Sequence, residues 1–117
     1  MRGGLLATLI IVATAAAQTP SPASASRGDA AKGKKLFASV GCYQCHGYMA
    51  QGGAGTGPRL APRPIAPAAF SRYIRRPSGD MPPYTAKVLT EQDVADIYAF
   101  LSAVPDPPSL DSVRLLK

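Results

Sequence analysis

The chain has 117 residues and a formal net charge of +6, with 13 basic and seven acidic side chains. This length suits one domain and excludes a large multidomain enzyme or a polytopic membrane protein. The basic residues form no dense run and do not alternate with aromatic residues, so the charge does not indicate nucleic-acid binding. It favours acidic partners or anionic surfaces instead.

The first 17 residues have the pattern of a secretory signal peptide. Arg2 gives a short positive start, residues 5–16 are largely apolar, and the alanines at 15–17 offer a cleavage site. The run is too short to span a bilayer comfortably, but without cleavage it would act as a membrane anchor. Residues 18–27 are rich in Ser, Pro and Ala and are expected to form a flexible leader. We therefore expect the chain in the periplasm.

The rest of the chain contains few bulky apolar side chains. Eighteen of the hundred residues from 18 to 117 are Leu, Ile, Val or Phe, and there is no Trp. That fraction lies near the range in which disorder competes with folding. A domain with so few core formers needs a disulfide, a metal or a cofactor for stability.

Three segments show apolar residues at helical spacing, over residues 29–40, 67–76 and 90–104. Their inward-facing stripes are expected to be Gly33, Leu36, Phe37 and Val40; Phe70, Tyr73 and Ile74; and Val94, Ile97, Tyr98 and Leu101. Three lysines lie largely off the first stripe and are expected to be solvated: Lys32, Lys34 and Lys35.

The segments between these helices are rich in Gly and Pro. Residues 47–64 and 78–84 are predicted to be loops, because Gly and Pro break regular structure. Residues 105–117 form a Pro-rich tail with several leucines, expected to fray or to dock on its own domain or on a partner. Loops of this length in a compact domain require something that organises them.

Cys42, Cys45 and His46 can provide that organisation. Two thiols three residues apart, followed directly by an imidazole, have the spacing of c-type haem attachment. The thiols can form thioethers along one porphyrin edge, and the imidazole then lies beneath the iron. A disulfide would close a very small loop, a thioredoxin-like pair needs a βαβ context, and zinc needs a fourth ligand. The motif therefore predicts one covalent haem c.

The second axial ligand is predicted by elimination. His46 is the only histidine, which leaves the three methionines. Met1 falls in the expected signal peptide, and Met49 lies only three residues after His46, on the same side of the ring. Met81 follows 35 residues after His46 in a loop stiffened by prolines and can reach the opposite face. We therefore predict His46 and Met81 as iron ligands, because thioether sulfur is an established partner of histidine; an open or water-bound position is the alternative.

Over residues 28–104 the chain resembles a class I c-type cytochrome. The motifs that carry this resemblance are Gly33 with Phe37, Cys42-Tyr43-Gln44-Cys45-His46-Gly47, Gly57-Pro58-Arg59-Leu60, Met81-Pro82-Pro83-Tyr84 and Phe100-Leu101. The resemblance implies an all-α fold, the cytochrome c fold. Three to four helices would wrap one covalently attached haem, joined by long Gly/Pro-rich loops.

The resemblance also implies roles for residues around the haem. The Pro58 carbonyl would accept a hydrogen bond from the His46 imidazole, and Leu60 would line the haem pocket. Gly33 would let the first and last helices cross closely. Two residues of the second predicted helix are expected near a haem propionate: Tyr73 and either Arg75 or Arg76.

One-electron transfer is the function that this ligand set predicts. A haem with two axial protein ligands has no open position for a substrate, and no second His serves as an acid–base group. We expect an electron carrier, not an enzyme, which accepts electrons from a periplasmic dehydrogenase as its subunit or soluble partner. Another cytochrome or a terminal oxidase would be the acceptor. A haem sensor or gas-binding protein with a labile Met81 is the alternative.

Overall fold

The computed structural model describes residues 27–116. The predicted signal peptide lies outside the described residues, as does most of the predicted leader. In chain order the elements are α1 (Ala30–Ser39), α2 (Tyr43–His46), α3 (Pro67–Arg75), α4 (Glu91–Ala103), η1 (Leu110–Ser112) and η2 (Arg114–Leu116). Residues 27–116 contain no strand, which confirms the predicted all-α class. Each predicted helix segment matches α1, α3 or α4 to within one residue at either end.

The starts of the two long helices are determined by side-chain caps. Asp29 accepts hydrogen bonds from the backbone N–H groups of Ala31 and Lys32, at 2.8 and 3.0 Å. At α4, Thr90 and Asp93 form a capping box in which each side chain accepts from the other's backbone N–H. Such caps satisfy N–H groups that lack partners in the first helical turn.

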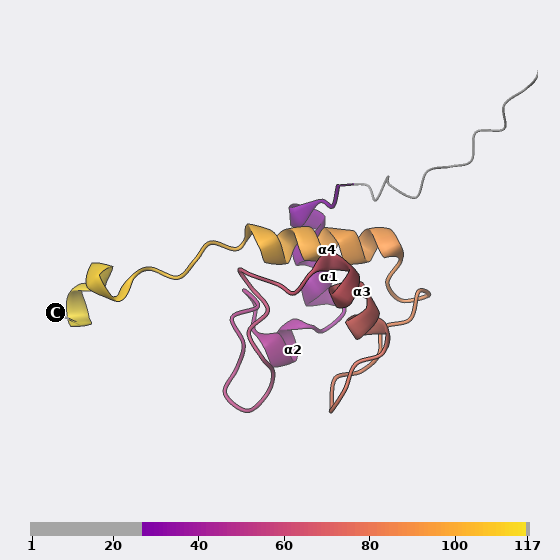
Figure 1. The fold of residues 1–117 in the computed structure, drawn as a ribbon, viewed down its shortest axis with the longest axis horizontal. Coiled ribbons are helices and arrows are strands. Elements are labelled where there is room, and N and C mark those ends of the chain that lie inside the picture. Colours follow the sequence, from indigo (N-terminus) through magenta and orange to yellow (C-terminus); the bar gives the residue numbers. More distant parts are fainter. Residues whose placement is uncertain (1–26, 117) are drawn as a thin grey trace, which may run out of the picture.

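The helices α1 and α4 cross in close contact, and α3 packs on α4 (Figure 1). Gly33 makes the crossing possible, because a Cβ there would collide with the Asp96 carbonyl. Beside it the rings of Phe37 and Phe100 lie 5.5 Å apart at 58°, a tilted arrangement that aromatic pairs favour. The buried apolar residues of the core are Phe37, Ala50, Ala61, Phe70, Ile74, Leu89, Val94, Ile97, Phe100 and Leu101.

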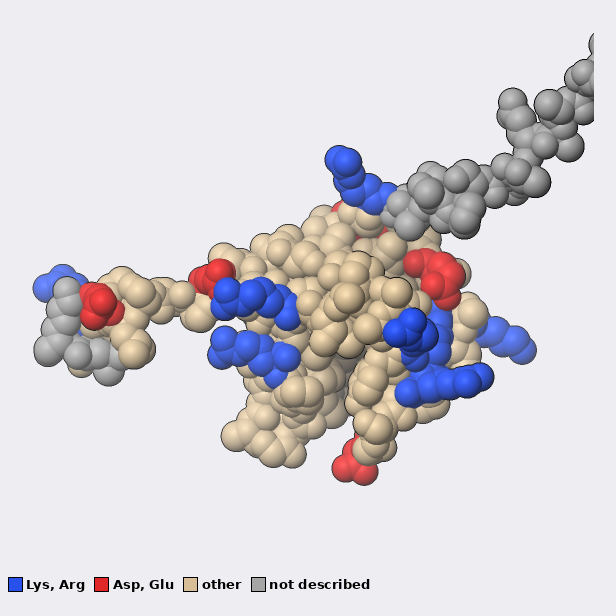
Figure 2. All heavy atoms as spheres, in the orientation of Figure 1, with Lys and Arg blue, Asp and Glu red and all other residues tan. Residues whose placement is uncertain are grey.

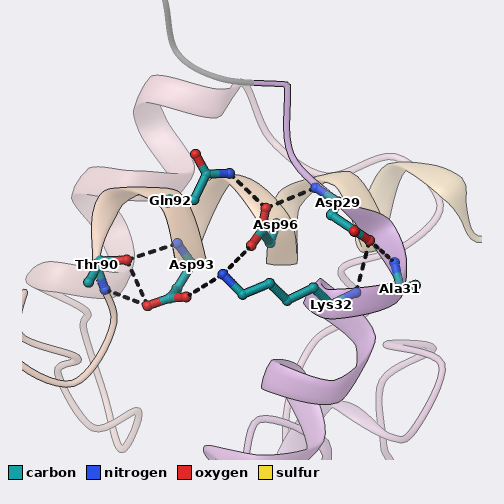
Figure 3. Close-up of polar contacts among 7 residues, drawn as sticks. All are labelled: Asp29, Ala31, Lys32, Thr90, Gln92, Asp93 and Asp96. Carbon is teal, nitrogen blue, oxygen red and sulfur yellow. Dashed lines mark hydrogen bonds and ion pairs between the residues drawn. The ribbon is translucent and has the colours of Figure 1, made fainter.

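A buried carboxylate joins the same two helices through polar contacts (Figure 3). Asp96 is 1% exposed, and its Oδ1 accepts from Asp29 N and from Gln92 Nε2, both at 2.8 Å. Its Oδ2 lies 2.9 Å from Lys32 Nζ, which also lies 3.1 Å from Asp93 Oδ1. The Lys32 ammonium lowers the pKa of Asp96 to about 2. Lys32 is exposed, as expected, but its ammonium also pairs with two carboxylates of α4, which the spacing did not predict.

The stripe predicted for α3 is correct except at Tyr73. Phe70 and Ile74 are buried, and the Phe70 ring packs 5.6 Å from that of Tyr98 on α4. Tyr73 is 43% exposed, and its hydroxyl lies 2.8 Å from Ser78 Oγ. A tyrosine has an apolar ring and a polar hydroxyl, so it fits a buried or an exposed position of a helix. Helical spacing alone therefore does not predict whether it is buried.

The tail after α4 leads away from the helices (Figure 1). Its two single-turn helices leave Leu110 75% and Leu115 95% exposed. Packing of the tail on its own domain, one of the expectations, is therefore not observed; docking on a partner stays a prediction. None of the helices within residues 27–116 is long and apolar enough to cross a membrane.

Replacing Gly33 with alanine should separate α1 from α4. Alanine gains about 1 kcal/mol of helix propensity over glycine. Overpacking against Asp96 should nevertheless lower the free energy of unfolding by about 1–3 kcal/mol. Denaturant titration of the haem-loaded protein measures this, with Lys34→Ala on the exposed side of α1 as control. Equal or higher stability of Gly33→Ala would contradict the close crossing.

Replacing Asp96 with asparagine should remove a pH-dependent contribution to stability. The folded-state pKa of Asp96 is depressed to about 2, below its ordinary value of 3.8. Its contribution is therefore complete above pH 4 and is lost as the pH falls toward 2. At pH 7 the variant should be about 1–3 kcal/mol less stable than the wild type. Unfolding titrations at several pH values should show this difference shrinking below pH 4; a constant difference would disprove the assignment.

Candidate functional site: a haem-binding cavity

The predicted attachment motif forms the short helix α2. Cys42 is the N-cap residue of α2 and has helical backbone angles. Cys45 and His46 are the last two residues of the helix. Residues three apart on a helix lie on the same side, so the two thiols face the same way. Cys45 is exposed, Cys42 is half-buried, and neither forms a disulfide. His46 is buried, so the imidazole turns into the protein while the thiols stay near its edge.

The His46 ring is oriented by one hydrogen bond. Its Nδ1 lies 2.8 Å from the carbonyl oxygen of Pro58. A carbonyl oxygen only accepts, so Nδ1 carries the proton and donates it. The other ring nitrogen, Nε2, then keeps its lone pair free. This tautomer is the one that binds a metal through Nε2.

The loop after α2 folds back over the helix. Thr56 Oγ1 donates to the Cys45 carbonyl at 3.0 Å, and the Leu60 N–H donates to the buried Ala50 at 2.9 Å. Gly57 allows the close approach, because a Cβ there would lie 2.8 Å from the Cys45 oxygen and 3.1 Å from His46 Nδ1. These contacts bring the carbonyl of residue 58 beside His46 and turn Leu60 inward.

Met81 lies in the loop between α3 and α4 and is half-buried. Its neighbours Asp80, Pro82 and Pro83 are exposed, so Met81 alone turns inward there. Met49, by contrast, is 40% exposed near α2. The structure therefore distinguishes the two methionines in the way that the elimination argument expects.

The predicted site residues meet around one cavity. Its walls come from α1, α2, α3, α4 and the loops between them, and the cavity that they enclose is small, with a volume of about 30 Å³. The lining residues are Phe37, Cys42, His46, Leu60, Phe70, Ile74, Met81, Tyr84, Leu89 and Ile97. Two predicted site residues do not line the cavity: Cys45 is exposed on α2, and Pro58 lies behind the imidazole.

The Cys42 thiol and the Tyr84 hydroxyl of the cavity wall stay protonated near pH 7. Burial raises the pKa of the Cys42 thiol, and burial together with the neighbouring thiol raises that of Tyr84 to about 12. The Tyr84 hydroxyl donates to the Val40 carbonyl at 2.9 Å. Most of the remaining lining is aliphatic or aromatic, so the wall suits the apolar atoms of a ligand.

Two residues near the cavity, Tyr84 and Arg75, have partners that could not be predicted from the sequence. Tyr84 belongs to a quoted motif, but its partner Val40 lies 44 residues earlier, and no local pattern connects them. Arg75, one of the two arginines considered for a propionate, donates to the Tyr84 carbonyl at 2.9 Å and to Glu91 Oε1 at 2.7 Å, and its position near a propionate stays a prediction. Long-range pairs of this kind leave no spacing signal in a single sequence.

The residues around the cavity fit a haem c. Of two thiols one helical turn apart, Cys42 lines the cavity and Cys45 is exposed beside it on α2, and a buried imidazole presents a free Nε2. A thioether lies on another wall, and aromatic and aliphatic side chains form the rest. This is the donor set of a thioether-linked haem with His and Met ligands. Within the described residues, no cluster of three His, Cys, Asp or Glu forms a separate metal site.

Comparison with known proteins gives one match. A family model described as "Cytochrome C oxidase, cbb3-type, subunit III" matches residues 28–101, from just before α1 to near the end of α4. No curated protein and no solved structure matches the chain. The match confirms the predicted cytochrome fold, the covalent haem c and one-electron transfer as the class of activity. The chain thus belongs to this family of c-type cytochrome domains, as a member with a single haem-attachment motif.

Proposed function

We propose that this cytochrome carries single electrons from a periplasmic dehydrogenase to a terminal oxidase or to another cytochrome. Cys42 and Cys45 hold the haem, and His46 and Met81 ligate its iron. The observation that carries this assignment is the buried His46, which donates Nδ1–H to Pro58 and faces the cavity that Met81 also lines.

The haem, when bound, supplies reversible exchange between ferrous and ferric iron. The protein's part is to hold that iron in one geometry. The bond from His46 to the Pro58 carbonyl prevents the ring from turning and makes Nε2 a better donor. Met81 would supply a thioether ligand to the iron, and thioether ligation favours the ferrous state. Leu60 and the other apolar lining residues exclude water from the ring.

The route for electrons is proposed at the edge that carries the cysteines. Cys45 is exposed, and Tyr48 beside α2 is 66% exposed and stacks on Tyr43, with ring centroids 4.5 Å apart. A partner that contacts this edge comes close to the porphyrin with little protein between. The same edge that receives an electron can release it, so a single carrier can serve donor and acceptor in turn.

Charge and family membership support the choice of partners. Basic side chains gather beside α3 on the face shown in Figure 2. Arg72 is exposed on α3, and the exposed Arg76 follows the helix directly. Such a surface steers acidic partners, more strongly at low salt. The family description names an oxidase, which supports a terminal oxidase as the acceptor. The signal-like residues 1–17 support the periplasm as the location.

Replacing Met81 with alanine should lower the reduction potential and open the iron. The wild type should show the ferric absorption band of thioether ligation and bind carbon monoxide slowly when reduced. The variant should lose the band and bind carbon monoxide rapidly, while Met49→Ala, at the exposed methionine, should match the wild type. Rapid binding by the wild type itself would favour the gas-binding alternative. An unchanged Met81→Ala spectrum would remove Met81 from the ligand set.

Membranes that contain the terminal oxidase should oxidise the reduced protein. The rate should fall as salt rises, because surface charges within reach of a partner are screened over about 8 Å at physiological ionic strength. Stopped-flow absorbance measures the rate, and an oxidase inhibitor gives the background. Oxidation no faster than this background would rule out the oxidase as acceptor and leave another cytochrome.

A further inference from the structure

The loop that carries Met81 has little hydrogen bonding of its own. Among the described residues, no backbone–backbone hydrogen bond involves residues 77–83. Pro82 and Pro83 have no N–H to donate. A segment of this kind does not hold a side chain at a defined depth by itself. The position of Met81 must therefore be determined where the loop joins the rest of the fold.

That junction is Tyr84, three residues after Met81. Its N–H donates to the Ile74 carbonyl at 2.9 Å, and its carbonyl accepts from Arg75 Nη1 at 2.9 Å. Its hydroxyl donates to the Val40 carbonyl, also at 2.9 Å. Val40 lies two residues before Cys42, so this bond connects the methionine side of the cavity to the attachment side.

Arg75 is in turn held between two helices. It lies at the end of α3, and its Nη2 lies 2.7 Å from Glu91 Oε1 at the start of α4. The Arg75 side chain is only 19% exposed, which is low for an arginine at a helix end. A guanidinium has several donors in a rigid plane, so one side chain can bond the loop and the carboxylate together.

We propose that Arg75 and Tyr84 form a clamp that positions Met81 for ligation of the iron. The clamp consists of four hydrogen bonds, one of which joins Arg75 to Tyr84, and it connects α1, α3 and α4 to the loop end. Both are positioning residues, since neither lines the iron axis as a donor. The inference rests on the proposed ligation by Met81. It adds that the contacts of Arg75 and Tyr84, outside the loop itself, determine how strongly Met81 binds the iron.

The test uses the haem-loaded protein and five variants. Arg75→Gln removes the guanidinium with both of its bonds. Tyr84→Phe is milder, because it removes only the hydroxyl, which bonds to the Val40 carbonyl and lies 4.0 Å from Cys42 Sγ. The matched controls are Lys87→Gln, at an exposed cation, and Tyr98→Phe, which keeps the ring that packs on Phe70. For each we would record the ferric thioether band, carbon monoxide binding to the reduced form, and the unfolding midpoint.

Arg75→Gln should increase the rate of carbon monoxide binding about tenfold and weaken the thioether band, because a hydrogen bond to a charged group is lost. Tyr84→Phe should act in the same direction to a smaller extent. Arg75→Lys keeps the charge but not the planar set of donors. Its rate of carbon monoxide binding should lie between those of Arg75→Gln and the wild type. The two controls should match the wild type.

Two results would overturn the clamp. If Arg75→Gln and Tyr84→Phe lower the unfolding midpoint but keep the band and bind carbon monoxide like the controls, the contacts are structural only. If the wild type lacks the band and Met81→Ala changes nothing, Met81 is not the ligand and the proposed ligation fails together with the clamp. The wild-type spectrum therefore separates the two failures.

Discussion

The close approach of α1 and α4 is the constraint on which the remaining structure depends. Gly33 allows the two backbones to meet, and the buried Asp96 secures the contact through Lys32 and the Asp29 N–H. The end of α1 leads within a few residues into the attachment helix, while α4 supports α3 and, through Glu91, the clamp on the methionine loop. The positions of both sides of the cavity thus depend on the crossing of α1 and α4.

The scarcity of bulky apolar residues has its explanation in this arrangement. Several of the buried core residues, among them Phe37, Phe70, Ile74, Leu89 and Ile97, also line the cavity. The core is therefore a shell around the cofactor site, and a bound porphyrin supplies much of its apolar interior. Ligand bound only to the folded state stabilises that state, so folding and haem attachment are thermodynamically linked.

Local patterns account for what the sequence could predict. Helical spacing located α1, α3 and α4, and the Cys42–His46 motif located the cofactor, because both signals span only a few residues. The partners of Lys32 and Arg75 could not be predicted in this way. Lys32 pairs with residues more than 60 positions away, and a charged residue off an apolar stripe normally indicates only solvent. The prediction that Tyr73 faces inward is wrong, because its ring favours burial whereas its hydroxyl favours exposure.

The contact between Asp96 and the Asp29 N–H also has a geometric consequence for the whole molecule. It holds the start of α1 against α4, whereas the haem-attachment helix follows the other end of α1, about 15 Å away along the axis. Residues 27–29, where the described chain begins, therefore lie at the end of α1 that is remote from the attachment edge. A tether at that point, whether to a membrane or to a larger assembly, would leave the electron-exchanging edge facing outward, free to sample partners.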